Sequence, residues 1–376
     1  IFIDYFDNPP AKAYADKHFV ASTLDVESVK RITKEECADM ICTACTDQAL
    51  LTVAAVSEEL QLPCYISYET ALNVTNKSYM KKVLVDNNIP TAKYKIVGDL
   101  DVDKIKDFQV PIGVKPVDCN SSKGVKRVDS ISDVSIYLSE AISYSRTQTA
   151  IIEEFKTGNE ISADFYIDNG CIKYLSATRS LKIKNRNSFT IICSEYPVID
   201  CNQQKKIIKI AEDIAKAFKL DNCPLLIQFI EDESGIYVLE FSARMGGGSK
   251  YYLIQTLSGV NIMSSYVDML LGIRPVILPS QRVNYCKMVY LYCVPGIFDH
   301  IEGFEYLKSS GYIENFFLYK TKGMKITNSE TSGDRPGGYL VTAVSAEELL
   351  SKVHYIDSYL KIIDSEGRDI MIHNLL

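Results

Sequence analysis

Long apolar runs are missing from this sequence, because no stretch of about 18 uninterrupted apolar residues occurs among its 376 positions. We therefore expect no membrane-spanning helix and no membrane partner, and the first residues predict no signal peptide or basic amphipathic leader. A strong charge imbalance is also missing, since 41 Lys and Arg stand against 48 Asp and Glu, a net charge of −7. This balance argues against a dedicated nucleic-acid binder, so we expect no nucleic-acid partner.

Histidine is scarce as well: there are four residues, none near the polar clusters described below, which counts against a His-dependent hydrolase. No internal repeat or linker-like tract occurs. Apolar residues (47%) and charged residues (24%) have globular proportions, which excludes a disordered or collagen-like chain. At roughly 100–200 residues per domain, the length predicts two or three domains.

The 11 cysteines are scattered and odd in number. Most lie in apolar runs, which is typical of small buried side chains in a reducing compartment, so we expect a cytoplasmic protein. Cys42 and Cys45 form a C-x-x-C pair, but His18 is the only histidine in that region and no second pair is close. Structural cysteines are favoured, and redox or metal use is the alternative.

The first 73 residues alternate short apolar runs with helical patterns, which predicts a parallel sheet covered by helices. The expected strands are 1–6, 39–43 and 64–66, and the expected helices are 26–34 and 47–60. The glycine-rich first turn that is usual in such folds is not present, and the chain begins at Ile1 without an initiator Met. We therefore expect the natural N-terminus upstream and a first element outside this sequence.

The remaining sequence predicts hairpins and amphipathic helices, an α+β chain with mixed sheets in three pieces. The expected helices are 77–88, 132–145, 203–218, 249–257, a following helix that ends at 271, and 346–358 with Ser345 as its N-cap. The expected strands are 112–116, 125–128, 150–155, 161–167, 172–176, 225–231, 235–241, 285–293, 312–319 and 338–344.

The stretch from Gln228 to Arg244 is the most informative for chemistry. The period of two along a strand places Glu240, Ser242 and Arg244 on one face, and Gln228 on the partner strand can lie beside them. Hard oxygen donors gathered in this way suit Mg²⁺, and a nearby guanidinium can offset charge on a transferred phosphoryl group. A surface hairpin with a salt bridge is the alternative.

Two loops carry possible anion sites. Gly246-Gly247-Gly248-Ser249 precedes a helix, and its free backbone N–H groups could hold a carboxylate or an acyl phosphate. Lys115 ends a strand before the polar loop 118–124, which includes Lys123 and predicts a phosphate clamp with a mobile lid. The alternative for the glycine loop is a helix cap, and the alternative for the loop 118–124 is a solvated turn. The acidic turn at 151–160 could meet an adenine edge and ribose hydroxyls, although most such turns are merely solvated.

In this order, the motifs resemble the ATP-grasp superfamily, specifically its carboxylate–amine ligase branch, which includes carbamoyl-phosphate-synthase-like and phosphoribosylglycinamide-synthetase-like members. The resemblance covers essentially the whole chain. The motifs that carry it are Asn76-Lys77, Val114-Lys115-Pro116 with its Ser/Lys/Gly loop, Glu153-Glu154-Phe155 with Glu160, and Gln228 with Glu240 and Arg244. It implies a truncated Rossmann-like domain (1–73), a grasp domain (74–272) with a lid at about 91–155, and a C-terminal mixed α/β domain (273–376).

The resemblance also implies residue roles. Lys77 and Lys115 would contact ATP phosphates beneath a loop that contains Ser122, Lys123 and Gly124. Glu153, Glu154, Phe155 and Lys156 would form the adenine-facing connector, and Glu160 would hold the ribose. Gln228, Glu240 and Ser242 would bind Mg²⁺ or Mn²⁺, while Arg244 would stabilise the acyl-phosphate step together with Lys115. Candidate substrate anchors are Gly247, Gly248, Lys250, Arg179 and Arg335.

Two departures from the family pattern concern the metal: Ser242 stands where Asn is usual, and Gln228 stands where a carboxylate is frequent. The implied reaction is ATP-dependent activation of a small carboxylate as an acyl phosphate, with release of ADP, followed by attack of a small amine. A phosphoribosylglycinamide-synthetase-like enzyme and a non-catalytic ATP-binding protein are the alternatives, and a biotin-dependent carboxylase subunit would need a separate carrier. The resemblance also makes a homodimer a fair expectation.

Overall fold

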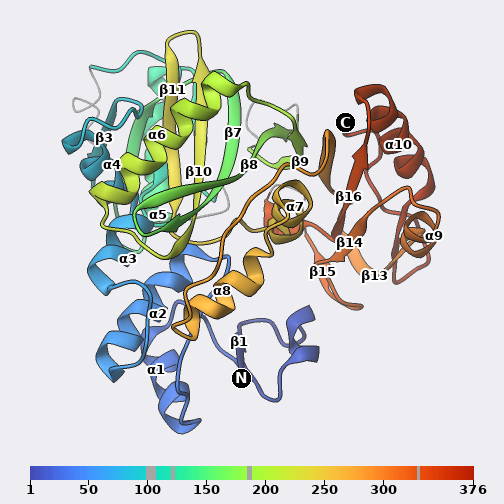
Figure 1. Cartoon of the computed structure of the whole chain (residues 1–376), viewed down its shortest axis with the longest axis horizontal. Helices are drawn as coiled ribbons and strands as arrows, with labels where there is room; N and C mark the ends of the chain where they lie inside the picture. Colours follow the sequence, from blue (N-terminus) through green and yellow to red (C-terminus); the bar gives the residue numbers. More distant parts are fainter. Residues whose placement is uncertain (99–106, 120–122, 184–188, 328–330) are drawn as a thin grey trace.

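The computed structural model describes residues 1–98, 107–119, 123–183, 189–327 and 331–376. Within these ranges the largest sheet has the strand order β11-β10-β7-β8-β9-β12-β16-β14, and all its neighbours are antiparallel. Its strands are β7 (Asn159–Asp168), β8 (Cys171–Lys182), β9 (Ile191–Tyr196), β10 (Cys223–Asp232), β11 (Gly235–Ser242), β12 (Tyr285–Tyr290), β14 (Asn315–Leu318) and β16 (Gly337–Ala343). This sheet joins the middle of the chain to its C-terminal part (Figure 1).

Three smaller sheets complete the described strands. An antiparallel sheet has the order β3-β6-β4-β5, formed by β3 (Tyr94–Val97), β4 (Ile112–Pro116), β5 (Lys126–Val128) and β6 (Ala150–Glu154). Another is formed by β13 (Gly296–Glu302) between β15 (Lys325–Ile326) and β17 (Lys361–Asp364). The strands β1 (Phe2–Asp4) and β2 (His18–Val20) pair in parallel.

The described helices are α1 (Val26–Glu35), α2 (Asp47–Leu60), α3 (Tyr68–Thr75), α4 (Lys77–Asp86), α5 (Val134–Tyr144), α6 (Cys201–Ala217), α7 (Lys250–Ser258), α8 (Ile262–Leu270), α9 (Phe304–Ser309) and α10 (Ala346–Tyr359). Helix α6 covers one face of the large sheet, whereas α1 and α2 lie below the sheets beside α3 (Figure 1). Short 3-10 turns occupy Pro10–Tyr14, Ile131–Asp133 and Ser332–Asp334. In the described ranges, no helix is both long and apolar enough to cross a bilayer.

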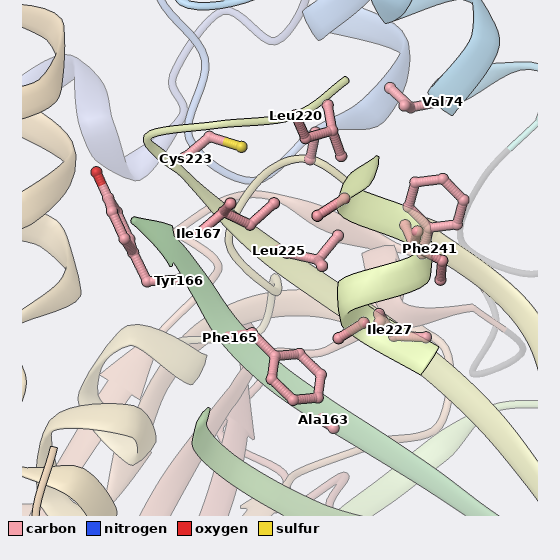
Figure 2. Close-up of a cluster of buried hydrophobic side chains, with 14 of the residues drawn as sticks. Val74, Ala163, Phe165, Tyr166, Ile167, Leu220, Cys223, Leu225, Ile227 and Phe241 are labelled. Atoms are coloured by element: carbon pink, nitrogen blue, oxygen red, sulfur yellow. The ribbon is translucent and has the colours of Figure 1, made fainter. Parts of the chain in front are cut away.

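The main core lies between one face of the large sheet and α6 with its neighbouring helices. Every second residue of β7 and β10 points into it, and Phe165, Ile227 and Phe241 meet there (Figure 2). Helix α6 contributes the fully buried side chains Ile207 and Ile214. Full burial of such an aliphatic side chain is worth about 1.5–3 kcal/mol, so this face fixes the hairpins in place.

The opposite face of β7, β8 and β9 is lined by hydroxyl groups. Ser162 is the register partner of Thr178, and Ser180 is the partner of Ser194. All four are buried, together with Asp164 on the same face of β7. Because successive residues of a strand point to opposite faces, the same strands that build the core with one set of residues present a polar floor with the alternating set.

Three expectations from the sequence are wrong. Segments 39–43 and 64–66 are not strands, so the expected N-terminal parallel sheet is reduced to β1 and β2 in the described residues. Both segments are anchored by side chains instead: the Tyr266 hydroxyl donates to the Thr43 carbonyl at 2.7 Å, and the Tyr65 hydroxyl donates to the Ala243 carbonyl at 2.9 Å. Within the described residues no sheet is mixed either, since β1 and β2 pair in parallel and all neighbouring strands of the three larger sheets pair antiparallel.

Candidate active site

An open cavity of about 520 Å³ lies where the polar floor of the large sheet meets residues from both ends of the chain. Phe6 and Pro9 reach it from the N-terminal segment, and Tyr319 and Thr331 reach it from the C-terminal part. The predicted site residues that line it are Gln228, Glu240, Arg244, Gly247, Gly248, Lys250 and Arg335. The fold thus gathers two of the three predicted metal ligands, the predicted catalytic arginine and four of the five candidate anchors around one space.

Gln228 and Glu240 face each other across the β10–β11 hairpin, as the sequence pattern predicts. They are register partners, and a bulge follows directly after Gln228. The Glu240 side chain is 42% exposed, which leaves its carboxylate accessible from the cavity. The pair therefore offers an amide oxygen and a carboxylate oxygen at the same position along the sheet.

Arg244 is held by Asp47, the first residue of α2. The Arg244 Nε donates to Asp47 Oδ1 at 2.8 Å, and its Nη2 pairs with Oδ2. Ser242 hydrogen-bonds to the same carboxylate. Burial alone would raise the pKa of Asp47, but the charge of Arg244 outweighs it and lowers that pKa. The guanidinium is therefore fixed in a bidentate pair at the cavity wall.

Lys77 links the helix α4 to the candidate metal ligands. Asn76 caps α4 by accepting from the Ser78 N–H at 2.9 Å, which sets Lys77 at the helix start. The Lys77 Nζ donates to the Cys119 carbonyl at 2.7 Å and lies 3.5 Å from Glu240 Oε2. The predicted phosphate-binding lysine is thus adjacent to the predicted metal-binding carboxylate.

Lys115 and Glu153 form a buried ion pair between the neighbouring strands β4 and β6. Lys81 of α4 lies 2.6 Å from the other carboxylate oxygen of Glu153. Burial alone would raise the pKa of Glu153, but the charges of Lys115 and Lys81 lower it to about 2. Burial would likewise lower the pKa of Lys115, but Glu153 and Glu240 outweigh it and raise that pKa. Glu153 therefore binds the two lysines with its side chain.

The other connector residues lie at the junction of β6 and β7. Lys156 lies 3.2 Å from Glu154 and 4.3 Å from the centre of the Tyr237 ring. Glu160 pairs with Lys182. The guanidinium of Arg127 lies 4.9 Å from the centre of the Phe155 ring, and the Phe155 and Phe189 centroids are 6.2 Å apart.

The predicted phosphate loop is described only in part. Ser122 lies outside the described residues. The Lys123 Nζ lies 5.0 Å from the centre of the Tyr144 ring. Gly124 has φ +70°, and a Cβ there would be 2.7 Å from Tyr144, so only glycine fits at this turn.

The glycine loop that precedes α7 carries Lys250 into the floor of the cavity. The Lys250 Nζ donates to Ser162 Oγ at 2.6 Å and lies 3.3 Å from Asp164 Oδ2. A Cβ on Gly246 would be 2.6 Å from Lys250 Cδ, so this glycine leaves room for the lysine stem. Lys250 is thus a cavity residue whose charge is balanced by a buried carboxylate.

Arg335 approaches from the C-terminal part of the chain. Its guanidinium lies 3.7 Å from the centre of the Tyr290 ring, Nε donates to the Tyr292 hydroxyl at 2.7 Å, and Nη2 donates to the Ile191 carbonyl at 2.8 Å. Among the described residues these partners are a ring, a phenol and a carbonyl, and none of them neutralises the positive charge of Arg335. Arg179 is not among the cavity residues, because it alternates with Ser180 and Thr178 on β8 and so belongs to the opposite face.

Three residues with a part in the site were missed by the sequence reasoning. Asp47 and Lys81 lie inside ordinary helical patterns, and Asp164 lies inside an apolar strand. A charged residue at a position that the pattern assigns to a buried face is the signal that could have revealed Lys81 and Asp164. Asp47 carries no such signal, because acidic residues are ordinary in a first helical turn.

The donors at the hairpin fit a hard cation that takes most of its ligands from water and phosphate. Among the described residues, no group of three or more His, Cys, Asp or Glu could hold a metal ion. Glu240 and Gln228 supply oxygen donors at the cavity wall, whereas Ser242 is buried and bound to Asp47. Glu240 with Gln228 would therefore hold the ion, with Ser242 the weakest of the three predicted ligands.

Comparison with known proteins identifies ATP-dependent ligases as similar proteins. Residues 75–248 match the family described as phosphoribosylglycinamide synthetase, ATP-grasp (A) domain. A D-alanine–D-alanine ligase of Clostridium perfringens is 26% identical over 222 residues, which cover 56% of this chain and 68% of the relative. A phosphoribosylamine–glycine ligase of Methanosphaera stadtmanae is 28% identical over 195 residues, 46% of this chain and 44% of the relative.

Solved structures share the fold over nearly the whole chain. An L-amino acid ligase from Bacillus licheniformis superposes with a TM-score of 0.75 at 21% identity, covering 93% of this chain and 88% of that one. Phosphoribosylglycinamide synthetase from Anaerococcus prevotii gives a TM-score of 0.71 at 18% identity, with coverage of 95% and 90%. The family match and the ligase relatives show that residues 75–248 are an ATP-grasp domain similar to those of carboxylate–amine ligases, and the solved structures show the same fold over nearly the whole chain.

Proposed function

We propose that this protein uses ATP to activate a small carboxylate as an acyl phosphate and then joins it to a small amine, releasing ADP and phosphate. The observation that carries the proposal is the single cavity that connects Gln228 and Glu240 to Arg244, the glycine loop and Arg335. One end of this space offers oxygen donors beside Lys77, and the other offers Arg335, which has no carboxylate partner among the described residues. A nucleotide phosphate and an organic anion can therefore meet at Arg244.

In the first step, a carboxylate oxygen of the substrate attacks the γ-phosphorus of ATP. A new bond forms between that oxygen and phosphorus, the bond from phosphorus to the β,γ-bridging oxygen breaks, and ADP leaves. Lys77 and Lys115 would bind the phosphates, and Arg244 would offset the charge that spreads over the transferred group. A divalent ion, when bound at Glu240 and Gln228, supplies further neutralisation of the phosphate charge.

In the second step, the amine attacks the carbonyl carbon of the acyl phosphate. The carbon–nitrogen bond forms, inorganic phosphate leaves with the electrons of the carbon–oxygen bond, and the nitrogen loses one proton to solvent or to the phosphate. The backbone N–H groups of the glycine loop and the guanidinium of Arg335 would hold the anionic groups in place. Positioning and electrostatic stabilisation account for the rate, so no nucleophilic side chain is needed.

The charges around the cavity favour a substrate with modest negative charge. Asp164 balances Lys250, Asp47 balances Arg244, and Arg179 lies on the other face of the sheet. The family match to phosphoribosylglycinamide synthetase supports the second candidate, a ligase whose substrate carries a phosphoribosyl group. Such a phosphate would have to bind near Arg335 and Lys320, which both line the cavity.

We also propose that residues 74–272 are the grasp unit, preceded by a domain at 1–73 and followed by one at 273–376. The family match at 75–248 lies within the central range. The β3–β6 sheet would be a lid within 91–155, which is supported by its separate small core of Val114, Leu138 and Ile152.

The test is the melting temperature with a non-hydrolysable ATP analogue, with and without Mg²⁺, on the wild type and on Glu240→Ala. Ligand at about 100 times its dissociation constant should add roughly 2.7 kcal/mol, a rise of several degrees. We expect a magnesium-dependent rise that is largely lost in Glu240→Ala and kept in Glu233→Ala, an exposed residue of the same hairpin turn. A wild type that melts cooperatively with no shift would contradict the proposal.

A further inference from the structure

Lys81 is a fully buried charged residue without a role in the proposed chemistry. Its exposed fraction is 0%, and it is among the largest side chains buried to this degree. Removing an ammonium group from water is unfavourable by several kcal/mol unless the charge is well paired. An apolar residue would fill this position on α4 without that penalty, so the lysine calls for a specific explanation.

The contacts of Lys81 join three elements. Its Nζ lies 2.6 Å from Glu153 Oε1 on β6 and donates to Thr91 Oγ1 at 2.5 Å. The Thr91 hydroxyl in turn donates to the Val238 carbonyl on β11 at 2.8 Å. The second oxygen of Glu153 pairs with Lys115. Lys81 therefore lies between the strand of a predicted phosphate-binding lysine and the strand that carries Glu240.

We propose that Lys81 is a positioning residue that keeps Lys115 available to the nucleotide, an inference that rests on the proposed ATP-dependent function. With nucleotide absent, Glu153 has two cations, one on each oxygen. When Lys115 binds a phosphate instead, the Glu153 carboxylate keeps its ion pair with Lys81. If Lys81 were neutral, Glu153 would be left with Lys115 alone and would hold it away from the phosphate.

The same contacts set the distance between the two sheets at the nucleotide site. Lys115 and Glu153 belong to the β3–β6 sheet, whereas Val238 lies two residues before Glu240 on the large sheet. Thr91 also forms a parallel bridge with Val238. Lys81 is the cation through which Glu153 is linked to this bridge, so it fixes Lys115 relative to Glu240.

The experiment compares dissociation constants of a non-hydrolysable ATP analogue and of adenosine, with Mg²⁺ present. In Lys81→Met we expect about tenfold weaker binding of the ATP analogue and unchanged binding of adenosine, which has no phosphate for Lys115 to hold. Lys82→Met is the matched control, because its side chain on the same helix is 70% exposed and pairs only with Asp86 among the described residues. It should bind both ligands like the wild type.

The double variant Lys81→Met/Glu153→Gln provides the decisive comparison. If Glu153 sequesters Lys115 once Lys81 is gone, neutralising Glu153 should recover about threefold or more of the lost affinity. Additional loss in the double variant, or equal loss for adenosine and the ATP analogue, would overturn the inference and assign Lys81 a purely structural role. If Lys81→Met does not fold, Thr91→Val removes the anchoring hydroxyl and keeps the charge, and it should weaken only the ATP analogue.

If the wild type binds the ATP analogue no more tightly than adenosine, both the proposed function and this inference are overturned. If the wild type binds the ATP analogue more tightly than adenosine, and Lys81→Met binds the ATP analogue as tightly as the wild type does, only this inference is overturned. The two failures are therefore distinguishable.

Discussion

At the scale of single residues, the cations around the site are arranged as compensated pairs. Asp47 binds Arg244, Glu153 binds Lys115 and Lys81, and these groups are largely buried. Breaking a buried pair by removing one partner is strongly destabilising, whereas the intact pair adds little to stability. We infer that these pairs hold the side chains in place before the nucleotide arrives, which lowers the cost of ordering them on binding.

The Glu153 carboxylate predicts a pH dependence of stability. Its pKa falls from the usual 4.5 to about 2 in the folded protein. The ionised carboxylate therefore adds to the free energy of unfolding above pH 4.5, and this contribution is lost as the pH falls toward 2. A pKa difference of this size corresponds to about 3 kcal/mol. In urea unfolding, the wild type should have a larger free energy of unfolding than Glu153→Gln at pH 5. This difference should become smaller as the pH is lowered to about 3. A difference of constant size over this interval would contradict the assignment.

The control for this measurement is Glu154→Gln. The Glu154 side chain is 48% exposed and pairs with Lys156 near the surface. Its variant should therefore keep the wild-type pH profile within about 0.5 kcal/mol.

Gly248 is required by its backbone conformation and by its neighbours. It has φ +68°, and a Cβ there would lie 2.8 Å from the Tyr290 hydroxyl and 3.1 Å from Arg335 Nη1. Gly248→Ala should therefore destabilise the protein by about 2 kcal/mol and weaken binding of the anionic substrate. Gly247→Ala is the control for stability, because the nearest atom to its Cβ would be 3.9 Å away. Equal unfolding free energies for the two variants would be inconsistent with this account.

At the scale of elements, hairpins, amphipathic helices and the first strand could be predicted from the sequence, whereas the strands expected at 39–43 and 64–66 do not form. The Asp232-Glu233-Ser234-Gly235 turn and the alternation on both sides predict β10 and β11, and the structure confirms their pairing. Segments 39–43 and 64–66 resemble strands because they are short and apolar. Such runs are ambiguous, because side-chain anchors such as Tyr65 and Tyr266 can replace a strand partner.

The candidate site was predictable where function requires a local motif. Gln228, Glu240 and Arg244 follow from one hairpin, and the structure places all three at the cavity. The partners of Asp47 and Lys81 could not be predicted, because Arg244 and Glu153 are distant from them in sequence. Arg179 was grouped with the anchors by charge alone, and the strand period places it on the other face.

Helix α6 provides a test of local stability without effect on the site. Its N-cap Asp200 accepts from the Asn202 and Gln203 N–H groups at 2.7 and 2.8 Å, and Gln203 completes a capping box. Asp200→Ala should reduce the free energy of unfolding by about 1 kcal/mol with unchanged nucleotide binding. Asp213→Ala, which removes an exposed pair with Lys209 in the same helix, should cost less than about 0.5 kcal/mol. If Asp213→Ala were the more damaging, the capping argument would fail.

At the scale of the whole molecule, the cavity is completed by the two ends of the chain. The Thr321 hydroxyl donates to the Asn8 carbonyl at 2.8 Å, and Lys320 lies over the Phe6 ring. Arg335 reaches the same space from the C-terminal part, and α7 brings Lys250 from the middle. A substrate in this cavity would contact the N-terminal segment, the large sheet and the C-terminal part of the chain, so its binding should raise the melting temperature of the molecule.

The central claim is that a carboxylate oxygen attacks ATP to form an acyl phosphate. The most direct measurement incubates the protein with ATP, Mg²⁺, an amine pool and carboxylic acids labelled with ¹⁸O in the carboxyl group, and analyses the released phosphate by mass spectrometry. We predict that the phosphate carries one ¹⁸O atom, that its release depends on both pools, and that Arg244→Lys greatly reduces it. Phosphate released without the label would contradict the claim, because the attacking oxygen would then have come from water.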